Sequence, residues 1–288
     1  MGNGDGTIAW RELLAEAAAR VGERDARRIV EELTDAAPGQ LHRELDDLVT
    51  ERALARFDEM VARRAAGEPL QYVLGRWGFR SLDLMVDRRV LIPRPETEVV
   101  AGLAIDAVVA RGTERDVLVA DLGTGSGAIA LAVAAECTAA RVLATDASAD
   151  ALAVARANLA GLGRAAARVS LHDGSWFDAL PDGLCGSLDV IVSNPPYVAD
   201  DEDLPAVVGE WEPPGALRAG PDGLDDLHCI VDQSVRWLAA DGTLVLEMAP
   251  DQTVAIARRC EQRGFVASIH QDLAGRDRAV VATREDAP

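Results

Sequence analysis

The sequence predicts an α/β fold in which an open, mostly parallel sheet of seven strands follows a small all-helical domain. Two observations carry this prediction. From about residue 93 onward, apolar β-branched runs alternate with stretches of helical spacing, whereas residues 7–67 show helical spacing alone. In addition, the glycine-rich loop Gly123–Gly127 joins one such run to a helix, and Asp146 ends the next run, as in nucleotide-binding βαβ units.

The first part of the chain is typical of a helical bundle. Trp10, Leu13 and Ala17 recur at helical spacing, and apolar residues continue this pattern almost to Gly67. We therefore expect an N-terminal helical domain over residues 1–75 and assign it to partner binding. The alternative is a cap that only supports folding. The stretch Gly67–Gly75 is bracketed by glycines and is expected to be a loop.

A hairpin is expected to connect the helical domain to the sheet domain. Trp77–Arg80 and Leu82–Val86 have the pattern of two short strands. We therefore assign residues 76–92 to a hairpin linker and residues 93–288 to the sheet domain. Within the latter, residues 199–224 are acidic and rich in proline and glycine, and are expected to form a long loop over the site.

The segment from Pro93 to Glu98 predicts the start of a helix. Pro95 suits the first helical position because its missing N–H is not needed there, and the acids Glu96 and Glu98 complement the helix dipole. Arg94 stands between two prolines, so it is held stiffly and could point into a site.

The remaining elements follow from alternating apolar runs and helical patterns. Helices are expected at Ala128–Ala135, Ala149–Leu159, Asp225–Leu238 and Gln252–Arg263. Strands are expected at Val117–Leu122, Arg141–Asp146, Arg168–Leu171, Leu188–Val192 and Thr243–Glu247, with Val266–Ile269 and Arg278–Ala282 as a closing antiparallel pair.

The glycine-rich loop predicts a nucleotide-binding site. Glycines let a ligand approach the backbone at a helix N-terminus, and Asp146 can accept hydrogen bonds from ribose hydroxyls. The loop is a GxGxG led by Asp121 rather than a GxGxxG. This spacing suits adenosine attached to an amino acid better than a dinucleotide pyrophosphate. Trp176, in the loop after a later strand, could flank an adenine ring or simply pack in the core or at its rim.

A second chemical motif, Asn194-Pro195-Pro196-Tyr197, begins where the strand Leu188–Val192 is expected to end. Ligands bind at such carboxyl ends in open α/β sheets. Two successive prolines remove two backbone donors and fix two φ angles, which makes a rigid turn. The Asn194 side-chain oxygen and the Pro195 carbonyl can both accept from one planar –NH₂ group, and the Tyr197 ring can cover that group. The alternative is a plain turn.

Composition excludes several classes of function. The net charge is −19, which argues against non-specific binding to nucleic-acid backbones. The chain contains no lysine, which excludes Schiff-base chemistry. Its four cysteines form no CxxC motif and its four histidines are scattered, so no metal site is expected. No run is long enough for a membrane span, and Met1–Gly6 lacks the features of a signal peptide. The cytoplasm is therefore the expected location.

Together these motifs resemble the class I S-adenosylmethionine-dependent methyltransferases, which have a Rossmann-like domain and include enzymes that modify planar nitrogens. The chain resembles more closely the release-factor glutamine methyltransferases, the HemK/PrmC family. The first resemblance is carried by Asp121–Gly127, Asp146 and Asn194–Tyr197. The resemblance to this one family is carried by Ile92–Glu98, Gly67–Gly75 and Gly275–Arg278. It runs nearly end to end and includes the helical domain.

The resemblance implies a role for each motif residue. The loop of Gly123, Thr124, Gly125, Ser126 and Gly127 would bind the methionine end of S-adenosylmethionine. Asp146 would bind its ribose and Trp176 would lie near its adenine. Asn194 and the Pro195 carbonyl would hold the substrate amide, with Pro196 completing the turn and Tyr197 packing on the amide.

Two positions depart from the family pattern. Ser175 stands where an acid often precedes the Trp176 position, and the nearby Asp173 could take the place of that acid. Ala249 stands where a glycine is common. Neither residue belongs to the amide-binding turn.

The implied reaction is methyl transfer to the glutamine side-chain amide in the Gly-Gly-Gln motif of peptide chain release factors. The implied partner is therefore a protein, with no direct nucleic acid and no membrane, and the enzyme is expected to be a monomer. The alternatives are a glutamine methyltransferase of a ribosomal protein, an amino-group DNA methyltransferase and a non-catalytic binding module. The motif Pro-Arg-Pro-Glu-Thr-Glu (93–98) favours the release-factor branch.

Overall fold

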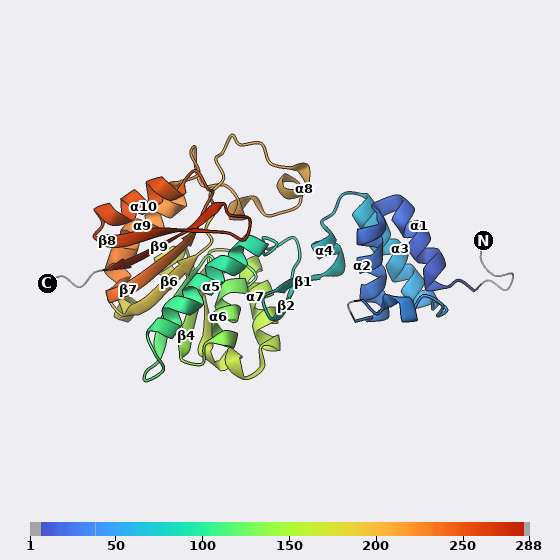
Figure 1. The fold of residues 1–288 in the computed structure, drawn as a ribbon, viewed down its shortest axis with the longest axis horizontal. Helices are drawn as coiled ribbons and strands as arrows, with labels where there is room; N and C mark the ends of the chain where they lie inside the picture. The colour runs from blue at the N-terminus through green and yellow to red at the C-terminus, as the bar shows by residue number, and fades with distance from the viewer. Residues whose placement is uncertain (1–6, 38, 285–288) are drawn as a thin grey trace. The chain divides into compact units, whose positions relative to one another are not determined.

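The computed structural model describes residues 7–37 and 39–284. Met1–Gly6, on which the signal-peptide argument rests, lie outside the described residues. The chain divides into two compact units, one that ends at Arg76 and one that begins at Trp77 (Figure 1). In its described residues the first unit contains helices, one isolated β-bridge between Ala9 and Leu48, and at Arg76 the start of a strand; the second unit contains a seven-stranded sheet. This confirms the predicted fold class.

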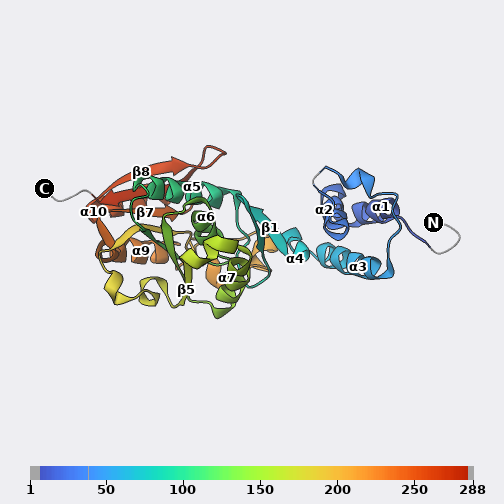
Figure 2. The same cartoon turned by 90° about the horizontal axis from the view of Figure 1, so that it is seen from below.

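The helical unit packs its helices around a core of its own. That core contains Trp10, Leu13, Ile29, Phe57 and Val61, all of them buried. Figure 2 shows the first three helices grouped together. The helices of this unit are α1 (Trp10–Val21), α2 (Glu23–Thr34), the 3₁₀ turn Leu41–Arg43, α3 (Glu51–Ala65) and α4 (Leu70–Leu74).

The last of these helices corrects the prediction of a loop over Gly67–Gly75. Leu70–Leu74 form one helical turn. Pro69 fixes the backbone just before this turn, and Gly75 ends it in the left-handed conformation with φ 75°. Burial of Tyr72 and Val73 holds this short helix, whose five residues are too few to give a helical pattern in the sequence.

The second unit opens with the expected hairpin, formed by β1 (Arg76–Phe79) and β2 (Leu82–Met85). Its main sheet has the strand order β5-β4-β3-β6-β7-β9-β8, in which β9 is antiparallel to both of its neighbours and the other pairs are parallel. The strands are β3 (Val117–Leu122), β4 (Ala140–Asp146), β5 (Val169–Asp173), β6 (Leu188–Ser193), β7 (Leu238–Glu247), β8 (Phe265–Gln271) and β9 (Asp277–Arg284).

All seven expected strands are present, and β7 is longer than expected. It begins at Leu238, which the sequence placed in the preceding helix, and Leu238 pairs with Leu188. The pairing then shifts register before Val190. The start of this strand is hard to recognise in the sequence, because Asp241 and Gly242 interrupt its apolar pattern.

Helices cover both faces of the sheet (Figure 1). On one face, α5 (Pro95–Ala110) and α6 (Ala128–Glu136) contribute most of a buried core, with α7 (Ala149–Gly161) beside them. On the other, α9 (Asp225–Trp237) and α10 (Thr253–Gln262) bury a second core. Strand order runs outward in opposite directions from β3 and β6. A crevice is expected where the order reverses, at the carboxyl ends of these two strands.

Residues 199–224, expected as a loop without elements, contain two short turns of helix, α8 (Ala206–Gly209) and Pro214–Ala216. The loop is tied to the segment before α5 by two contacts. Arg94 forms an ion pair with Glu212, and the Arg88 guanidinium lies over the Trp211 ring at 4.1 Å from its centroid. Among the described residues, no helix is long and apolar enough to cross a membrane.

Candidate active site

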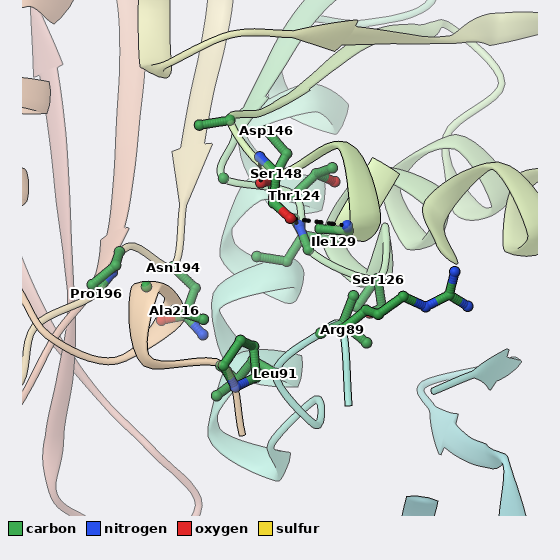
Figure 3. A pocket seen from close by; sticks show the side chains of 18 of the residues that line it. Arg89, Leu91, Thr124, Ser126, Ile129, Asp146, Ser148, Asn194, Pro196 and Ala216 are labelled. Atoms are coloured by element: carbon green, nitrogen blue, oxygen red, sulfur yellow. Dashed lines mark hydrogen bonds between the residues drawn. The ribbon is translucent and has the colours of Figure 1, made fainter. Parts of the chain in front are cut away.

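A cavity of about 540 Å³ opens at the carboxyl ends of β3, β4 and β6, within the size range of small-molecule sites. In Figure 3, Asn194 and Pro196 lie on one side of it and Thr124, Asp146 and Ser148 on another. Most of the residues predicted for the site line this cavity: Gly123, Thr124, Gly125, Ser126, Asp146, Trp176, Asn194 and Pro196. Three others do not line it: Gly127, Pro195 and Tyr197.

The glycine-rich loop leaves room for a ligand. Gly125 has φ 57°, and a Cβ built on it would meet nothing within 4 Å, so its backbone faces open space. A Cβ on Gly123, at φ 71°, would come within 3.0 Å of the Trp176 ring. Glycine is therefore required at Gly123 both by its conformation and by the ring beside it.

Asp121 holds this loop to the helix that follows it. Its side chain is 1% exposed, and Oδ2 accepts from the Thr124 hydroxyl at 2.6 Å and from Ala130 N–H at 3.0 Å. Burial raises the pKa of this carboxyl to about 6. Its second oxygen, Oδ1, is buried and has no hydrogen-bond partner among the described residues. The site thus retains an unused acceptor directly under the loop.

Asp146 ends β4 as expected and organises the opposite side of the loop. Its Oδ2 accepts from Gly125 N–H at 2.8 Å and its Oδ1 from Ser148 N–H at 2.9 Å. Burial raises the pKa of this carboxyl, against the effect of these two backbone donors. Each carboxylate oxygen has further acceptor capacity, so the side chain can also bind hydroxyl groups in the cavity.

Trp176 lines the cavity and adopts a left-handed conformation with φ 46°. Burial raises the pKa of the Asp226 carboxyl, and hydrogen bonding with the Trp176 side chain lowers it. Asp226 also lines the cavity, whereas Asp173, expected to replace the family acid, is exposed and does not. Asp226, at the start of α9, is thus the acid that the structure places beside this ring, and the role of Asp173 stays a prediction.

Asn194 reaches the cavity from the end of β6, where the sequence placed it. Its Nδ2 donates to Thr97 Oγ1 at 3.2 Å. Tyr197 turns away from the cavity, and its hydroxyl donates to Glu247 Oε1 at 3.4 Å. Thr97 is 4% exposed and Glu247 is 1% exposed, so both are buried, whereas Asn194 and Tyr197 are half-buried.

The sequence did not identify Thr97, Glu247 or Asp226 as parts of the site. Thr97 could have been found, since it belongs to the selective motif 93–98 and occupies the first turn of α5. The cavity also takes walls from the segment before α5 and from the loop 199–224, including Arg89, Leu91, Pro93, Pro213 and Ala216. Arg94 does not line the cavity; it pairs with Glu212.

These features fit S-adenosylmethionine. Gly125 presents open backbone, Asp146 presents spare acceptors at the end of β4, and Asp121 Oδ1 is a buried acceptor without a partner among the described residues. A flat aromatic side chain, Trp176, stands at the edge of the same cavity. No group of three or more His, Cys, Asp or Glu side chains in the described part of the chain is placed to hold a metal ion.

Comparison with known proteins decides the family. The family model described as PrmC N-terminal domain matches residues 8–75, and the one described as Methyltransferase small domain matches residues 105–211. A release factor glutamine methyltransferase of Xylella fastidiosa is 41% identical over 93% of this chain and 96% of its own length. One from Cereibacter sphaeroides is 42% identical, over 93% and 94%. This chain belongs to the release factor glutamine methyltransferase family.

Membership confirms the predicted resemblance, and with it the predicted enzyme class, a protein-glutamine methyltransferase that uses S-adenosylmethionine. A solved methyltransferase from Pyrococcus furiosus, 16% identical, matches 82% of this chain and 99% of its own with a TM-score of 0.51. At this identity the likeness concerns the fold alone. The methyl donor is therefore S-adenosylmethionine, and the cavity at the carboxyl ends of β3, β4 and β6 is the candidate site for it.

Proposed function

We propose that this protein transfers the methyl group of S-adenosylmethionine to the side-chain amide nitrogen of the glutamine in the Gly-Gly-Gln motif of peptide chain release factors. The observation that carries the proposal is that Asn194 and Pro196 line the same cavity as the glycine-rich loop. The turn to which we assign amide binding and the loop to which we assign cofactor binding therefore border one cavity. The names of the relatives, release factor glutamine methyltransferases, supply the class of substrate.

We assign cofactor binding to the loop Gly123–Gly127, to Asp146 and to Trp176. The backbone of the loop would hold the methionine end, Asp146 the ribose and Trp176 the adenine. Asn194 and the Pro195 carbonyl would accept from the two N–H bonds of the substrate amide. Pro196 keeps the turn rigid. The Tyr197 hydroxyl contacts Glu247 and its ring does not line the cavity, so Tyr197 would pack on the amide only once the substrate is bound.

S-adenosylmethionine supplies an activated methyl group on a positively charged sulfur. The N–CH₃ bond forms as the S–CH₃ bond breaks, and the electron pair of the S–CH₃ bond stays on sulfur. An amide nitrogen is a weak nucleophile, so the protein must align it with the S–CH₃ bond. Two acceptors on the –NH₂ group fix the nitrogen and stabilise the positive charge that develops on it. One amide proton leaves to water after transfer.

We further propose the domain organisation expected from the sequence. Residues 1–75 bind the release factor, residues 76–92 form a hairpin linker between the domains, and residues 93–288 carry out methyl transfer. The helical unit has its own buried core, so it can present a surface independently of the cavity. We propose that the enzyme acts as a cytoplasmic monomer and contacts protein rather than nucleic acid. The net charge of −19 supports this last point.

The test is transfer of a labelled methyl group with release factor, ribosomal protein and DNA offered in parallel. We expect label in the release factor alone, and mass spectrometry should place it on the glutamine of the Gly-Gly-Gln motif. A release factor with alanine in place of that glutamine is the matched control and should accept no label. Label that enters only the ribosomal protein or only DNA would refute the proposed substrate.

A further inference from the structure

One side chain on α7, Asn158, joins the hairpin β1–β2 to the glycine-rich loop. Its Oδ1 accepts from Met85 N–H at 2.7 Å, and its Nδ2 donates to the Met85 carbonyl at 3.1 Å and to the Ser126 carbonyl at 2.8 Å. Met85 ends β2, which lies beside α7 (Figure 1). Ser126 is buried and lines the cavity (Figure 3). Neither the cofactor assignment nor the amide-binding turn gives Asn158 a role.

These hydrogen bonds fix the orientation of the Asn158 amide. Only the oxygen of an amide can accept from Met85 N–H, so the two N–H donors of the same amide face the two carbonyls. The side chain thereby pairs with Met85 as a residue of a neighbouring strand would. A two-stranded hairpin is only marginally stable by itself, so a partner of this kind stabilises β2.

Other contacts also hold the hairpin to the sheet domain. Phe79 and Leu84 are buried in its core, and Arg80 forms an ion pair with Glu136 on α6. Of these contacts, that of Asn158 is the one that also reaches the glycine-rich loop. A change in the loop can therefore reach the hairpin through this side chain.

The Ser126 carbonyl depends on Asn158 because α6 gives it no donor. Gly127 is the N-cap of α6, and its carbonyl accepts the first helical bond. Ser126 precedes the N-cap. Ala130 N–H, which would pair with Ser126 in a longer helix, donates to Asp121 Oδ2 instead. A buried carbonyl without a donor is costly, so loss of Asn158 should turn this peptide group and distort the loop.

We propose that Asn158 is a positioning residue that holds the cofactor-binding loop in shape and couples it to the hairpin linker. Cofactor binding should then stabilise the bonds between Asn158 and Met85, and an intact hairpin should favour cofactor binding. The two effects are equal in free energy, because linkage is reciprocal. This inference rests on the proposed function in that the loop Gly123–Gly127 holds the cofactor. The coupling reaches the segment of chain that joins the two units.

The first test is amide hydrogen exchange, resolved to single residues, with and without S-adenosylhomocysteine. In the native protein we expect this ligand to slow exchange at Gly125 in the loop and also at Met85, whose N–H donates to Asn158. In Asn158→Ala, exchange at Met85 should be at least ~10-fold faster without ligand, and the ligand should no longer slow it. Arg156→Ala, at an exposed position of the same helix, is the control and should behave as native.

The second test is the dissociation constant for S-adenosylhomocysteine, measured by calorimetry. Asn158→Ala should bind this ligand at least ~10-fold more weakly, because the Ser126 carbonyl loses its donor. Arg156→Ala should bind it with native affinity.

Asn158→Asp separates the two contacts of the side chain. Its carboxylate can still accept from Met85 N–H but cannot donate to the Ser126 carbonyl. Without ligand, exchange at Met85 should stay within about threefold of native. The affinity should nevertheless be as low as in Asn158→Ala, and the ligand should not slow exchange at Met85. This variant also serves if Asn158→Ala fails to fold.

Slower exchange at Gly125 with no change at Met85 in the native protein would overturn the coupling. Native affinity in Asn158→Asp, or an equal loss of affinity in Arg156→Ala, would overturn the positioning role, because the hairpin or the helix as a whole would then be responsible. If the ligand protects no part of the loop Gly123–Gly127, the cofactor assignment fails and this inference fails with it. If the native protein methylates another substrate, only the proposed substrate fails, since the coupling concerns the cofactor.

Discussion

Asn194 and Thr97 are joined by a hydrogen bond of 3.2 Å from the Asn194 amide nitrogen to the Thr97 hydroxyl oxygen, across 97 positions of the sequence. The bond links the turn after β6 to the first turn of α5. It leaves the Asn194 oxygen as the atom free to meet a donor in the cavity. The pair therefore connects the two motifs that distinguish this sequence, Pro93–Glu98 and Asn194–Tyr197.

Asp146→Ala should weaken cofactor binding by roughly 1–3 kcal/mol, since ribose hydroxyls would lose a charged acceptor. The same change removes the acceptor of Gly125 N–H, which shapes the loop. Titration calorimetry with S-adenosylmethionine measures the loss. Asp146→Asn is the matched control, because it keeps one acceptor oxygen and should fall between alanine and native. Unchanged affinity in the alanine variant would show that the ribose lies elsewhere.

Gly123→Ala should impair cofactor binding for a steric reason. The added Cβ would lie 3.0 Å from the Trp176 ring, in a backbone conformation of φ 71° that alanine disfavours. We expect a weaker affinity for S-adenosylmethionine and an altered Trp fluorescence as the ring moves. Gly112→Ala is the control: its φ is 78°, no atom lies within 4 Å of its added Cβ, and it does not line the cavity. A native affinity in Gly123→Ala would contradict the proposed role of this close approach.

Glu247→Gln should change how stability depends on pH. Burial raises the pKa of the Glu247 carboxyl from its ordinary value of 4.5 to about 7 in the folded protein. Between these values the folded state binds more protons than the unfolded state, so the free energy of unfolding falls as pH rises through this window. Glutamine carries no charge that must be buried. The free energy of unfolding of the variant should therefore exceed that of the native protein by up to roughly 3 kcal/mol above pH 7.

Calorimetric unfolding of the cofactor-free protein between about pH 5 and 8 measures this difference. Asp121, whose pKa burial raises to about 6, contributes a fall of the same sign in both proteins. The informative quantity is therefore the difference between variant and native, which should grow with pH. A constant difference would mean that Glu247 is already ionised throughout the range.

Arg94→Ala should loosen the loop over the cavity. Arg94 pairs with Glu212, which is 4% exposed and whose Oε2 also accepts from Ile92 N–H at 3.2 Å. Removing the arginine leaves a buried carboxylate with a single backbone donor, which is costly. We expect amide hydrogen exchange in residues 206–216 to accelerate at least ~10-fold, with exchange in the sheet unchanged. Glu212→Gln, which retains an acceptor, should have a smaller effect.

Local sequence patterns were sufficient to predict the sheet and the two motifs. Seven β-branched runs gave seven strands, and Asn194 and Asp146 lie where their strands end. These positions depend on neighbours in the chain, so periodicity and turn chemistry suffice. The short helix Leu70–Leu74 was missed because burial rather than local preference holds it.

The supporting side chains of the site could not be predicted in the same way. Asp226 meets Trp176, and Glu212 meets Arg94, from segments far apart in the sequence. Nothing in the local sequence around an acid says which distant aromatic ring or cation it will meet. Tyr197 shows the same limit: its place in the motif suggested a wall of the cavity, but the buried Glu247 draws its hydroxyl away from the cavity.

The central claim is that Asn194 aligns the substrate amide for transfer. The most direct measurement is the single-turnover rate of methyl transfer to release factor for native protein, Asn194→Ala and Asn194→Asp at saturating cofactor. We expect Asn194→Ala to lose at least ~10²-fold while binding cofactor within a modest loss. Asn194→Asp should recover part of that rate, since it keeps an acceptor oxygen, but its charge also stabilises the sulfonium before transfer. A native rate in Asn194→Ala would contradict the account.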